Sequence, residues 1–354
     1  MVLWRKVLEE GRFPKEWLSV LRRFYGKHVD LSDNSKSNYA RAVSSFLKHF
    51  NVRPEDVCVE MFDEWGSRLL EEGKTKGTIW VYKQCLRKLL RDLGYLDDKE
   101  YKAIGCTYSH KELLSKKPEV VSEEELQKIL REWSGKWSIR DKAIVAMLWE
   151  AGLRAKELLS LKLRDVSVEW IETDKGKYPI VHVDVRESKT NTRRVQVIKY
   201  GTIVEEWLEW HPYRWDEDAA LFPRDNGKEA LSYSRLRTII LEMGDRVLKK
   251  RLTPHMFRHT AATEKFKNGA SEQEVKYFMG WSKSSRMVER YSHVRGEEWL
   301  ARELERYGFK TERNKNGLTI QVKKCPICGE INSPIRLMSK KRGAKLDESP
   351  VVEK

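Results

Sequence analysis

Apolar residues recur at helical spacing through the first hundred positions of the chain, with charged residues between them. Four such stripes stand out: Trp17 to Tyr25, Tyr39 to Phe50, Val57 to Leu70 and Ile79 to Leu93. The pattern predicts an all-α first domain, a helical bundle over residues 1–112, followed by a polar linker over residues 113–119.

A second domain begins where Ser122 is followed three residues later by Glu125, the form of a helix capping box. Residues 141–151 are almost entirely apolar and predict a buried helix. Between residues 165 and 197 apolar and polar positions alternate, which predicts a small antiparallel sheet of three strands. Helical spacing then returns, so we expect a mixed α+β domain over residues 120–308.

The chain of 354 residues carries a formal net charge of +15, which suits a polyanionic partner and above all a nucleic acid. Hydrophobic residues still make up 40% of it, so we expect folded domains. The sequence has no long apolar run and no signal-peptide pattern, so we expect no membrane contact and a cytoplasmic, nucleoid-associated protein. Five scattered cysteines exclude a disulfide framework. Abundant Lys and Glu with scarce Gln are typical of hyperthermophiles.

The fourth apolar stripe and the turn before it carry four cations on their polar side, Lys74, Lys76, Lys83 and Arg87. Such a run is often only a solvated helix face. With this net charge, contact with DNA phosphates is an equal alternative, and the four are candidate DNA-binding residues.

The densest group of candidate catalytic side chains comes later. A helix that begins at Pro254 places His255, Arg258 and His259 on one face, and an isolated Tyr291 follows 33 residues after Arg258 (291 minus 258). Around a phosphodiester, an arginine can grip the non-bridging oxygens and a tyrosine hydroxyl can attack phosphorus. From this stretch alone, a basic amphipathic helix with a solvated histidine is the alternative.

Two further cations lie upstream. Arg154 follows Gly152, the expected end of the buried helix, and Glu157 comes one turn later, where it can orient the arginine in an anion site. Lys189 falls between the last two predicted strands, where a lysine can swing into a groove. Taken singly, these features also fit a surface ion pair and an exposed hairpin lysine.

Together and in this order, the motifs resemble those of the tyrosine recombinases, the phage-integrase family. AGLRAKEL around Arg154 resembles the family's first arginine box, and HMFRH from His255 resembles its His-x-x-Arg box. ESKTNTRRVQV around Lys189 resembles the hairpin that holds a catalytic lysine, and MGW followed by RYSHV resembles the box that ends at the tyrosine. The resemblance implies that residues 1–112 are a core-binding domain, a SAM-like helical bundle.

The resemblance also implies a role for each residue. Tyr291 would be the nucleophile, forming a 3′-phosphotyrosine bond, and Lys189 would protonate the departing 5′ oxygen. Glu157 and His259 would orient their neighbours. The phosphate would be held by Arg154, Arg258, His255 and Trp281. No metal or other cofactor is implied, because guanidinium groups supply the positive charge, and no ATP, because the tyrosyl ester conserves the bond energy.

The implied function is site-specific recombination of double-stranded DNA by an integrase of a virus or plasmid, from an archaeal or thermophilic host. We expect a homotetramer at synapsis and a monomer or dimer in free solution. A type IB topoisomerase-like nicking and closing enzyme is one alternative, because it uses the same chemistry, and a DNA-binding protein with a decayed site is the other. The ten residues from Trp281 to Tyr291 slightly exceed the usual family spacing, which leaves open whether the tyrosine acts within its own subunit.

Residues 309–354 differ from the rest of the chain. Cys325-Pro-Ile-Cys328-Gly is a common half of a zinc site, but no further Cys or His follows to complete four ligands. We expect a flexible basic tail that adds phosphate contacts, and no metal. A zinc ion shared between subunits, or the remnant of a zinc ribbon, is the alternative.

Overall fold

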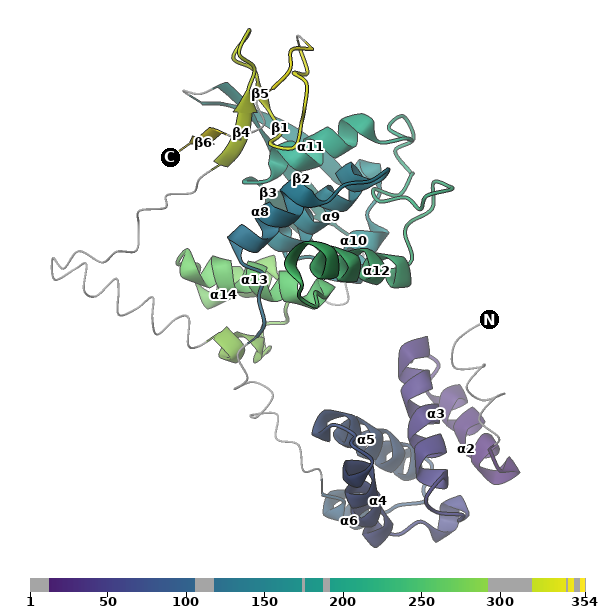
Figure 1. Ribbon diagram of the computed structural model, residues 1–354. Helices are drawn as coiled ribbons and strands as arrows, with labels where there is room; N and C mark the ends of the chain where they lie inside the picture. The colour runs from purple at the N-terminus through teal and green to yellow at the C-terminus, as the bar shows by residue number, and fades with distance from the viewer. Residues whose placement is uncertain are drawn as a thin grey trace, which may run out of the picture. The chain divides into compact units, whose positions relative to one another are not determined.

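The computed structural model describes residues 13–105, 118–173, 176–186, 192–291, 320–341, 343–346 and 351–353. The chain forms two compact units, Met1–Leu113 and Leu114–Lys354, and each is described by itself (Figure 1). Most of the linker expected over residues 113–119 lies outside the described residues.

The described part of the first unit is helical, as its apolar stripes predict. Ser32 and Thr75 each accept a hydrogen bond from the backbone N–H three residues later, at the start of the second and fourth of the long helices. A further short helix begins with a capping box of Asp97 and Glu100, which apolar spacing did not predict. The elements are α2 (Lys15–Lys27), α3 (Asp33–Leu47), the 3-10 helix η1 (Pro54–Asp56), α4 (Val59–Glu71), α5 (Lys76–Asp92) and α6 (Asp98–Ala103).

Large aromatic side chains fill the core of this unit. Trp17, Phe46 and Trp65 are fully buried, and the rings of Phe46 and Trp65 meet edge to face with centroids 5.2 Å apart. The indole N–H of Trp17 donates to the carbonyl of Val52 at 2.8 Å, so its polar atom is satisfied within the core. The apolar stripes of the sequence therefore face one another in a single core.

The basic side of α5 is less solvated than the sequence predicts. Lys83 is buried, and its ammonium group donates to a carboxylate oxygen of Asp63 at 3.0 Å. The half-buried Arg87 donates to the carbonyl of Ile104 at 3.2 Å and lies over the ring of Tyr101. This burial contradicts both alternatives for Lys83, the solvated face and the DNA-phosphate contact, because its ammonium group is turned toward Asp63 of α4.

The second unit begins with α8 (Glu123–Glu132), which opens with the predicted capping box of Ser122 and Glu125. The long apolar helix α9 (Ser138–Ala151) packs against both α13 and α11, so it forms the centre of the core. The remaining helices are α10 (Ala155–Ser160), η2 (Leu163–Asp165), α11 (Gly201–Trp210), α12 (Tyr233–Met243), the π-helical turn η3 (Gly244–Leu248), α13 (Pro254–Lys267), α14 (Glu272–Phe278) and the 3-10 turn η4 (Met287–Tyr291).

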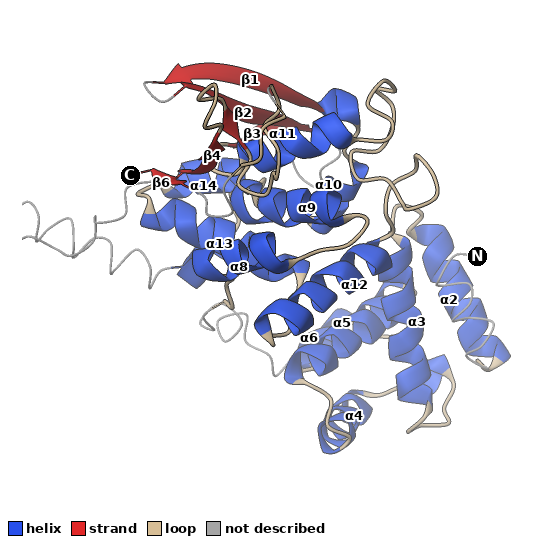
Figure 2. Cartoon of the chain, turned by 45° about the horizontal axis from the view of Figure 1, so that its top comes forward, coloured by secondary structure: helices blue, strands red, loops and turns tan. Residues whose placement is uncertain are grey.

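The predicted antiparallel meander is present. Strands β1 (Val166–Thr173), β2 (Gly176–Val185) and β3 (Arg193–Val197) pair in the order β1-β2-β3, with Val183 opposite Val195. Alternate residues of β2 and β3 are buried against the helices, and Figure 2 shows the sheet on one side of them. Because Arg193 shares the buried face of β3 with Val195, the sheet carries one charged side chain inward.

The described part of the C-terminal segment has strands of its own. Strands β4 (Ile320–Lys324), β5 (Ile331–Asn332) and β6 (Val351–Glu353) pair in the order β5-β4-β6. The ammonium group of Lys340 bonds to Glu205 of α11 at 2.6 Å, and Arg336 bonds to Glu209 of α11 at 2.9 Å. The prediction of a flexible tail is therefore wrong for these residues, because pairing and ion pairs hold them against the core.

Candidate active site

Arg154 occupies the turn between α9 and α10, where several groups fix its side chain. Glu157 accepts from its backbone N–H at 2.9 Å and from Nη1 at 2.6 Å, and the carbonyl of Gly280 accepts from Nη2 at 3.0 Å. Gly152 ends α9 with φ +60°, and a Cβ there would lie 2.8 Å from that of Ala261. Only glycine permits this turn and this close approach together, and both place Arg154 beside α13.

Arg258 comes from α13 and is buried beside Arg154. Its Nη1 donates to the carbonyl of Gly152 at 2.6 Å, and its Nη2 donates to the carbonyl of Met279. Burial and then the nearby charge of Arg154 lower the pKa of Arg258 to about 9, so the group keeps its charge at neutral pH. Three backbone carbonyls from two segments, residue 152 and residues 279–280, thus fix two guanidinium groups side by side.

Glu157 connects this pair to a residue that the sequence analysis missed. Its oxygens accept from Arg193 Nη1 at 3.2 Å and Nη2 at 2.9 Å, and the Arg193 side chain is fully buried. Burial alone would raise the pKa of Glu157, but hydrogen bonds from Arg193 and Arg154 outweigh it and lower the pKa to about 2. Arg193 Nε also donates to the carbonyl of Phe278 at 2.7 Å. An arginine on the inward face of a strand was the signal that could have revealed this role.

Tyr291 ends η4 and is fully buried. Its hydroxyl lies 2.7 Å from Nδ1 of His259, and its ring stacks on Trp281 with centroids 6.0 Å apart. Burial raises the pKa of Tyr291 to about 12, although Arg290 and Arg258 oppose the shift. Burial, with Arg290 nearby, lowers the pKa of His259 to about 4, so the imidazole is neutral at pH 7 and can accept the tyrosine proton in a hydrogen bond.

One pocket of about 340 Å³ brings these side chains together. It is lined by Arg154, His255, Arg258, His259, Trp281, Ser282, Ser285, Met287 and Tyr291. Burial and the two arginines lower the pKa of His255, so it too is neutral at pH 7 and can donate only through its ring N–H. The pocket can therefore hold an anionic group between two fixed positive charges, with a tyrosine hydroxyl in its wall.

The structure brings together five of the six residues expected to be catalytic, and Lys189 lies outside the described residues. Glu157 contacts Arg154, as the sequence predicts, whereas the contact of His259 with Tyr291 was not predicted. Apolar residues at helical spacing also predict an amphipathic helix over residues 297–307, which lie outside the described residues. Ser282, Ser285 and Met287 line the pocket without having been predicted, since loop residues of common type give no sequence signal.

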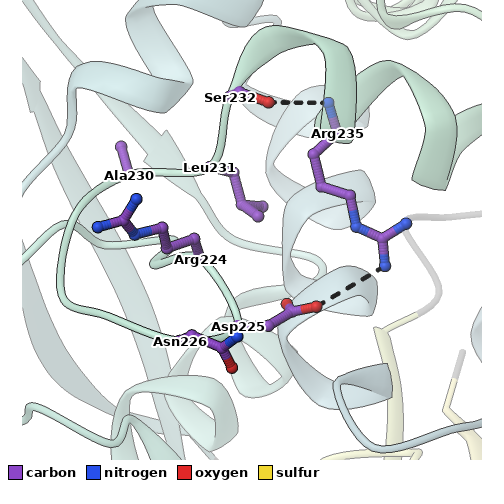
Figure 3. Close-up of a pocket in the computed structure, with 7 residues that line it drawn as sticks. All are labelled: Arg224, Asp225, Asn226, Ala230, Leu231, Ser232 and Arg235. Atoms are coloured by element: carbon purple, nitrogen blue, oxygen red, sulfur yellow. Dashed lines mark hydrogen bonds and ion pairs between the residues drawn. The ribbon is translucent and has the colours of Figure 1, made fainter.

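A second pocket, of about 590 Å³, lies at the start of α12 (Figure 3). Its two arginines face acidic partners: Arg224 bonds to Glu229 at 2.7 Å, and Arg235 lies 4.0 Å from Asp225. It is lined by Arg224, Asp225, Asn226, Ala230, Leu231, Ser232 and Arg235. No tyrosine or histidine lines it, so it lacks the hydroxyl of Tyr291 and the neutral imidazoles that line the first pocket.

The part of the chain that the structure describes shows neither a metal site nor a membrane-spanning helix. No group of three or more His, Cys, Asp or Glu side chains in that part of the chain is arranged to hold a metal ion. None of its helices combines the length and the apolar character needed to cross a membrane.

Comparison with known proteins agrees with the geometry of the first pocket. The model of the phage integrase family matches residues 119–298, just over half of the 354 residues. The tyrosine recombinase XerD of Oceanobacillus iheyensis is 25% identical over 287 residues, covering 75% of this chain and 89% of that protein. The tyrosine recombinase XerA of Pyrococcus furiosus is 28% identical over 264 residues, covering 65% and 88%.

The fold has a close counterpart among solved structures. The XerH site-specific recombinase, in its post-cleavage complex with a palindromic difH substrate, aligns with a TM-score of 0.60 at 19% identity, covering 86% of this chain and 95% of that one. The fold, the family match and the named relatives agree. The chain therefore belongs to the phage integrase family and is a site-specific recombinase of the tyrosine type.

Proposed function

We propose that this protein cuts and rejoins duplex DNA by transferring the 3′ phosphate of a cut strand to Tyr291. One observation carries the proposal: Tyr291 lines the same pocket as the two fixed guanidinium groups of Arg154 and Arg258. The tyrosine oxygen bonds to phosphorus, the bond from phosphorus to the 5′ oxygen breaks, and a 5′-hydroxyl leaves. The reverse attack, by a 5′-hydroxyl of another duplex, completes strand exchange.

The residues around the pocket divide the work of this step. The two arginines neutralise the non-bridging oxygens as charge builds up on them, with His255 as a neutral donor. His259 holds the tyrosine hydroxyl in place through the 2.7 Å contact, and its Nδ1 takes the tyrosine proton as the oxygen attacks phosphorus. Lys189 supplies the proton that the departing 5′ oxygen needs, a role that its likeness to the family's hairpin lysine supports.

The proposed chemistry uses no metal ion and no nucleotide. Guanidinium groups supply the charge that a metal would provide elsewhere, and the phosphotyrosine ester keeps the energy of the broken bond. Cleavage should therefore proceed unchanged in excess EDTA and without ATP.

We propose further that Tyr291 acts within its own subunit. Its ring is buried against Trp281 and it lines the pocket of its own chain, so it has no need to reach a neighbour's phosphate. The test mixes Tyr291→Phe with Arg154→Ala on one substrate. Action in cis predicts that the mixture stays inactive, whereas action in trans would restore cleavage, because one subunit would supply the arginine and the other the tyrosine.

Recombination also requires assembly and DNA contacts outside the pocket. Two duplexes present four strands, and one tyrosine per strand implies a homotetramer at synapsis, formed from monomers or dimers. The helical unit would be the core-binding domain, with the exposed Lys74 and Lys76 as phosphate contacts. The net charge of +15 supports this nucleic-acid partner and association with the nucleoid.

We propose an archaeal, thermophilic host and a virus or plasmid as the source of the protein. The XerA relative from Pyrococcus furiosus and the Lys- and Glu-rich composition support the host. A melting temperature within the mesophilic range of about 45–65 °C would contradict it.

The central experiment traps the covalent intermediate. Duplexes bound by the wild-type chain are first selected from a pool with a randomised centre, and each is then nicked near the candidate cut so that the 5′-hydroxyl fragment diffuses away. A denaturing gel should show a protein–DNA adduct for the wild type and none for Tyr291→Phe. Tyr277→Phe is the matched control, because Tyr277 is exposed and does not line the pocket.

The outcomes separate the competing functions. An adduct that persists in Tyr291→Phe would refute the assignment of the tyrosine. Relaxation of supercoiled DNA lacking the selected site, without strand exchange between two sites, would favour the topoisomerase-like alternative. Absence of any adduct with the wild type would favour a protein that only binds DNA.

A further inference from the structure

The sequence CPICG at residues 325–329 is not used by the catalytic pocket, and its surroundings contain a second turn of the same kind. In the first turn, the Cys325 N–H donates to the carbonyl of Glu330 at 2.9 Å. The N–H of Gly329 donates back to the carbonyl of Cys325 at 2.9 Å, and Gly329 has φ +69°. These two bonds define a knuckle, a tight turn that directs the side chains of its first and fourth residues to one side.

The second turn lies 14 residues later and repeats both bonds. The N–H of Ser339 donates to the carbonyl of Ala344 at 2.7 Å, and that of Gly343 donates to the carbonyl of Ser339 at 2.9 Å. Gly343 has φ +61°, close to the +69° of Gly329 at the same position of the first knuckle. The flanking strand pairs repeat as well. Lys324, just before the first turn, pairs with Ile331 just after it, and Met338 pairs with Lys345 across the second turn in the same way.

The two knuckles face each other. The side chain of Ser339, at the first position of the second knuckle, hydrogen-bonds the sulfur of Cys325, at the first position of the first. Cys328 also hydrogen-bonds Cys325, so the two sulfurs are neighbours. In the sequence, Arg342 follows Ser339 by three residues, as Cys328 follows Cys325, and residue 342 lies outside the described residues.

We infer that the two knuckles are those of a zinc ribbon, and that this chain retains only two of the four metal ligands that such a ribbon needs. Cys325 and Cys328 supply two thiolates, but Ser339 stands at the first position of the second knuckle, and the sequence has Arg342 where the spacing of the first knuckle would put its second ligand. A structural zinc site needs four ligands, and an arginine side chain supplies none because it stays protonated. The chain therefore keeps the fold of a metal ribbon without the metal.

Other contacts take over the stabilising role of the ion. Lys340, inside the second knuckle, bonds to Glu205 at 2.6 Å, and its ammonium group lies 5.3 Å from the ring centre of Trp170. Arg336 bonds to Glu209 at 2.9 Å, and the carboxyl of Glu206 accepts a hydrogen bond from Ser333. In this chain the second knuckle thus docks the ribbon onto α11 in place of completing a metal site.

The test restores the missing ligands in the full-length chain. Ser339→Cys with Arg342→Cys should take up about one Co²⁺ or Zn²⁺ per chain, with the intense sulfur-to-cobalt charge-transfer band of a tetrahedral tetrathiolate site. The wild type should bind the metal more weakly than this variant and should not show this band, because it offers only two thiolates. Metal content after gel filtration gives an independent count.

Two controls keep the result decisive. Lys341→Cys with Lys345→Cys places two cysteines at exposed, non-equivalent positions of the same segment and should not create the site. Adding Cys325→Ser and Cys328→Ser to the restored variant should abolish uptake, and circular dichroism checks that each variant is folded. A folded restored variant without the tetrathiolate band would overturn the inference. So would uptake by the lysine control, or half an equivalent of zinc in a dimeric wild type.

Discussion

Glu157 is the acidic residue on which both the ordering of Arg154 and the burial of Arg193 depend. The Arg193 side chain is fully buried and that of Glu157 is 2% exposed, so neither charge can turn to solvent if the other is removed. Glu157→Gln keeps the shape of the side chain and deletes its charge. We expect this change to destabilise the second unit and to leave the first unit unaffected, because the two units have separate cores.

The size of the effect follows from the pKa of the carboxyl group. Its pKa falls from 4.5 to about 2 on folding, which corresponds to about 3 kcal/mol of stabilisation at pH 7. This agrees with the roughly 3–5 kcal/mol typical of breaking a buried ion pair. For a domain of this size, about 3 kcal/mol lowers the melting temperature by roughly 6–12 °C.

The pH dependence has a definite sign. Because the pKa is lower in the folded state, the stabilisation is fully present above the unfolded-state value of 4.5 and is lost as the pH falls toward 2. The difference between wild type and Glu157→Gln should therefore shrink from about 3 kcal/mol at pH 7 to about 2 kcal/mol near pH 3.5.

Differential scanning calorimetry of the full chain measures this difference, with the transition of the helical unit as an internal reference. Glu172→Gln is the matched control, because Glu172 is 80% exposed and its pairing with Lys177 is solvated. The reasoning is refuted if Glu157→Gln melts at the wild-type temperature, if the control shifts equally, or if the difference grows in acid.

Three further predictions concern other parts of the molecule. Lys76→Ala should weaken DNA binding and reduce the slope of log affinity against log salt concentration by about one, as binding titrations at several salt concentrations would show. Lys83→Met should leave that slope unchanged and lower the melting temperature of the helical unit, which calorimetry measures. Gly152→Ala should cost more than about 1 kcal/mol in urea unfolding, because φ +60° is strained for alanine and its Cβ meets a neighbour at 2.8 Å; a neutral effect would contradict the geometry. Lys340→Ala should make the C-terminal segment cleavable by trypsin at lower salt than in the wild type, since it removes the bond to Glu205; unchanged digestion would argue against ion-pair docking.

The elements that the sequence predicts well are those with strong local patterns. The apolar run of α9, the capping box at Ser122 and the alternation through β2 each reflect forces acting within a few residues. The capping box that opens α6, Asp97 with Glu100, was present in the sequence but stood outside any apolar stripe. The spacing of the first knuckle also recurs in the sequence from Ser339 to Gly343, but this second stretch contains no cysteine and therefore gave no sign of a second knuckle.

The features that the sequence could not predict depend on tertiary contacts. The hydrogen bond between His259 and Tyr291 spans 32 positions, and no local pattern specifies it. The burial of Lys83 depends on which side of α5 packs against α4, because that orientation decides whether a cation on the basic side faces solvent or pairs with Asp63. The fixing of both arginines by backbone carbonyls of residues 152, 279 and 280 also required the fold.

Mass spectrometry of the trapped DNA adduct tests the central claim most directly. After nuclease and trypsin digestion, cleavage at Arg290 and Arg295 releases the peptide YSHVR, in which Tyr291 is the one tyrosine. The account predicts a phosphonucleotide on this peptide and none on YFMGWSK, the peptide that begins at Tyr277. A nucleotide on the Tyr277 peptide, on a peptide containing Tyr307, or on a serine would show that the pocket described here does not supply the nucleophile.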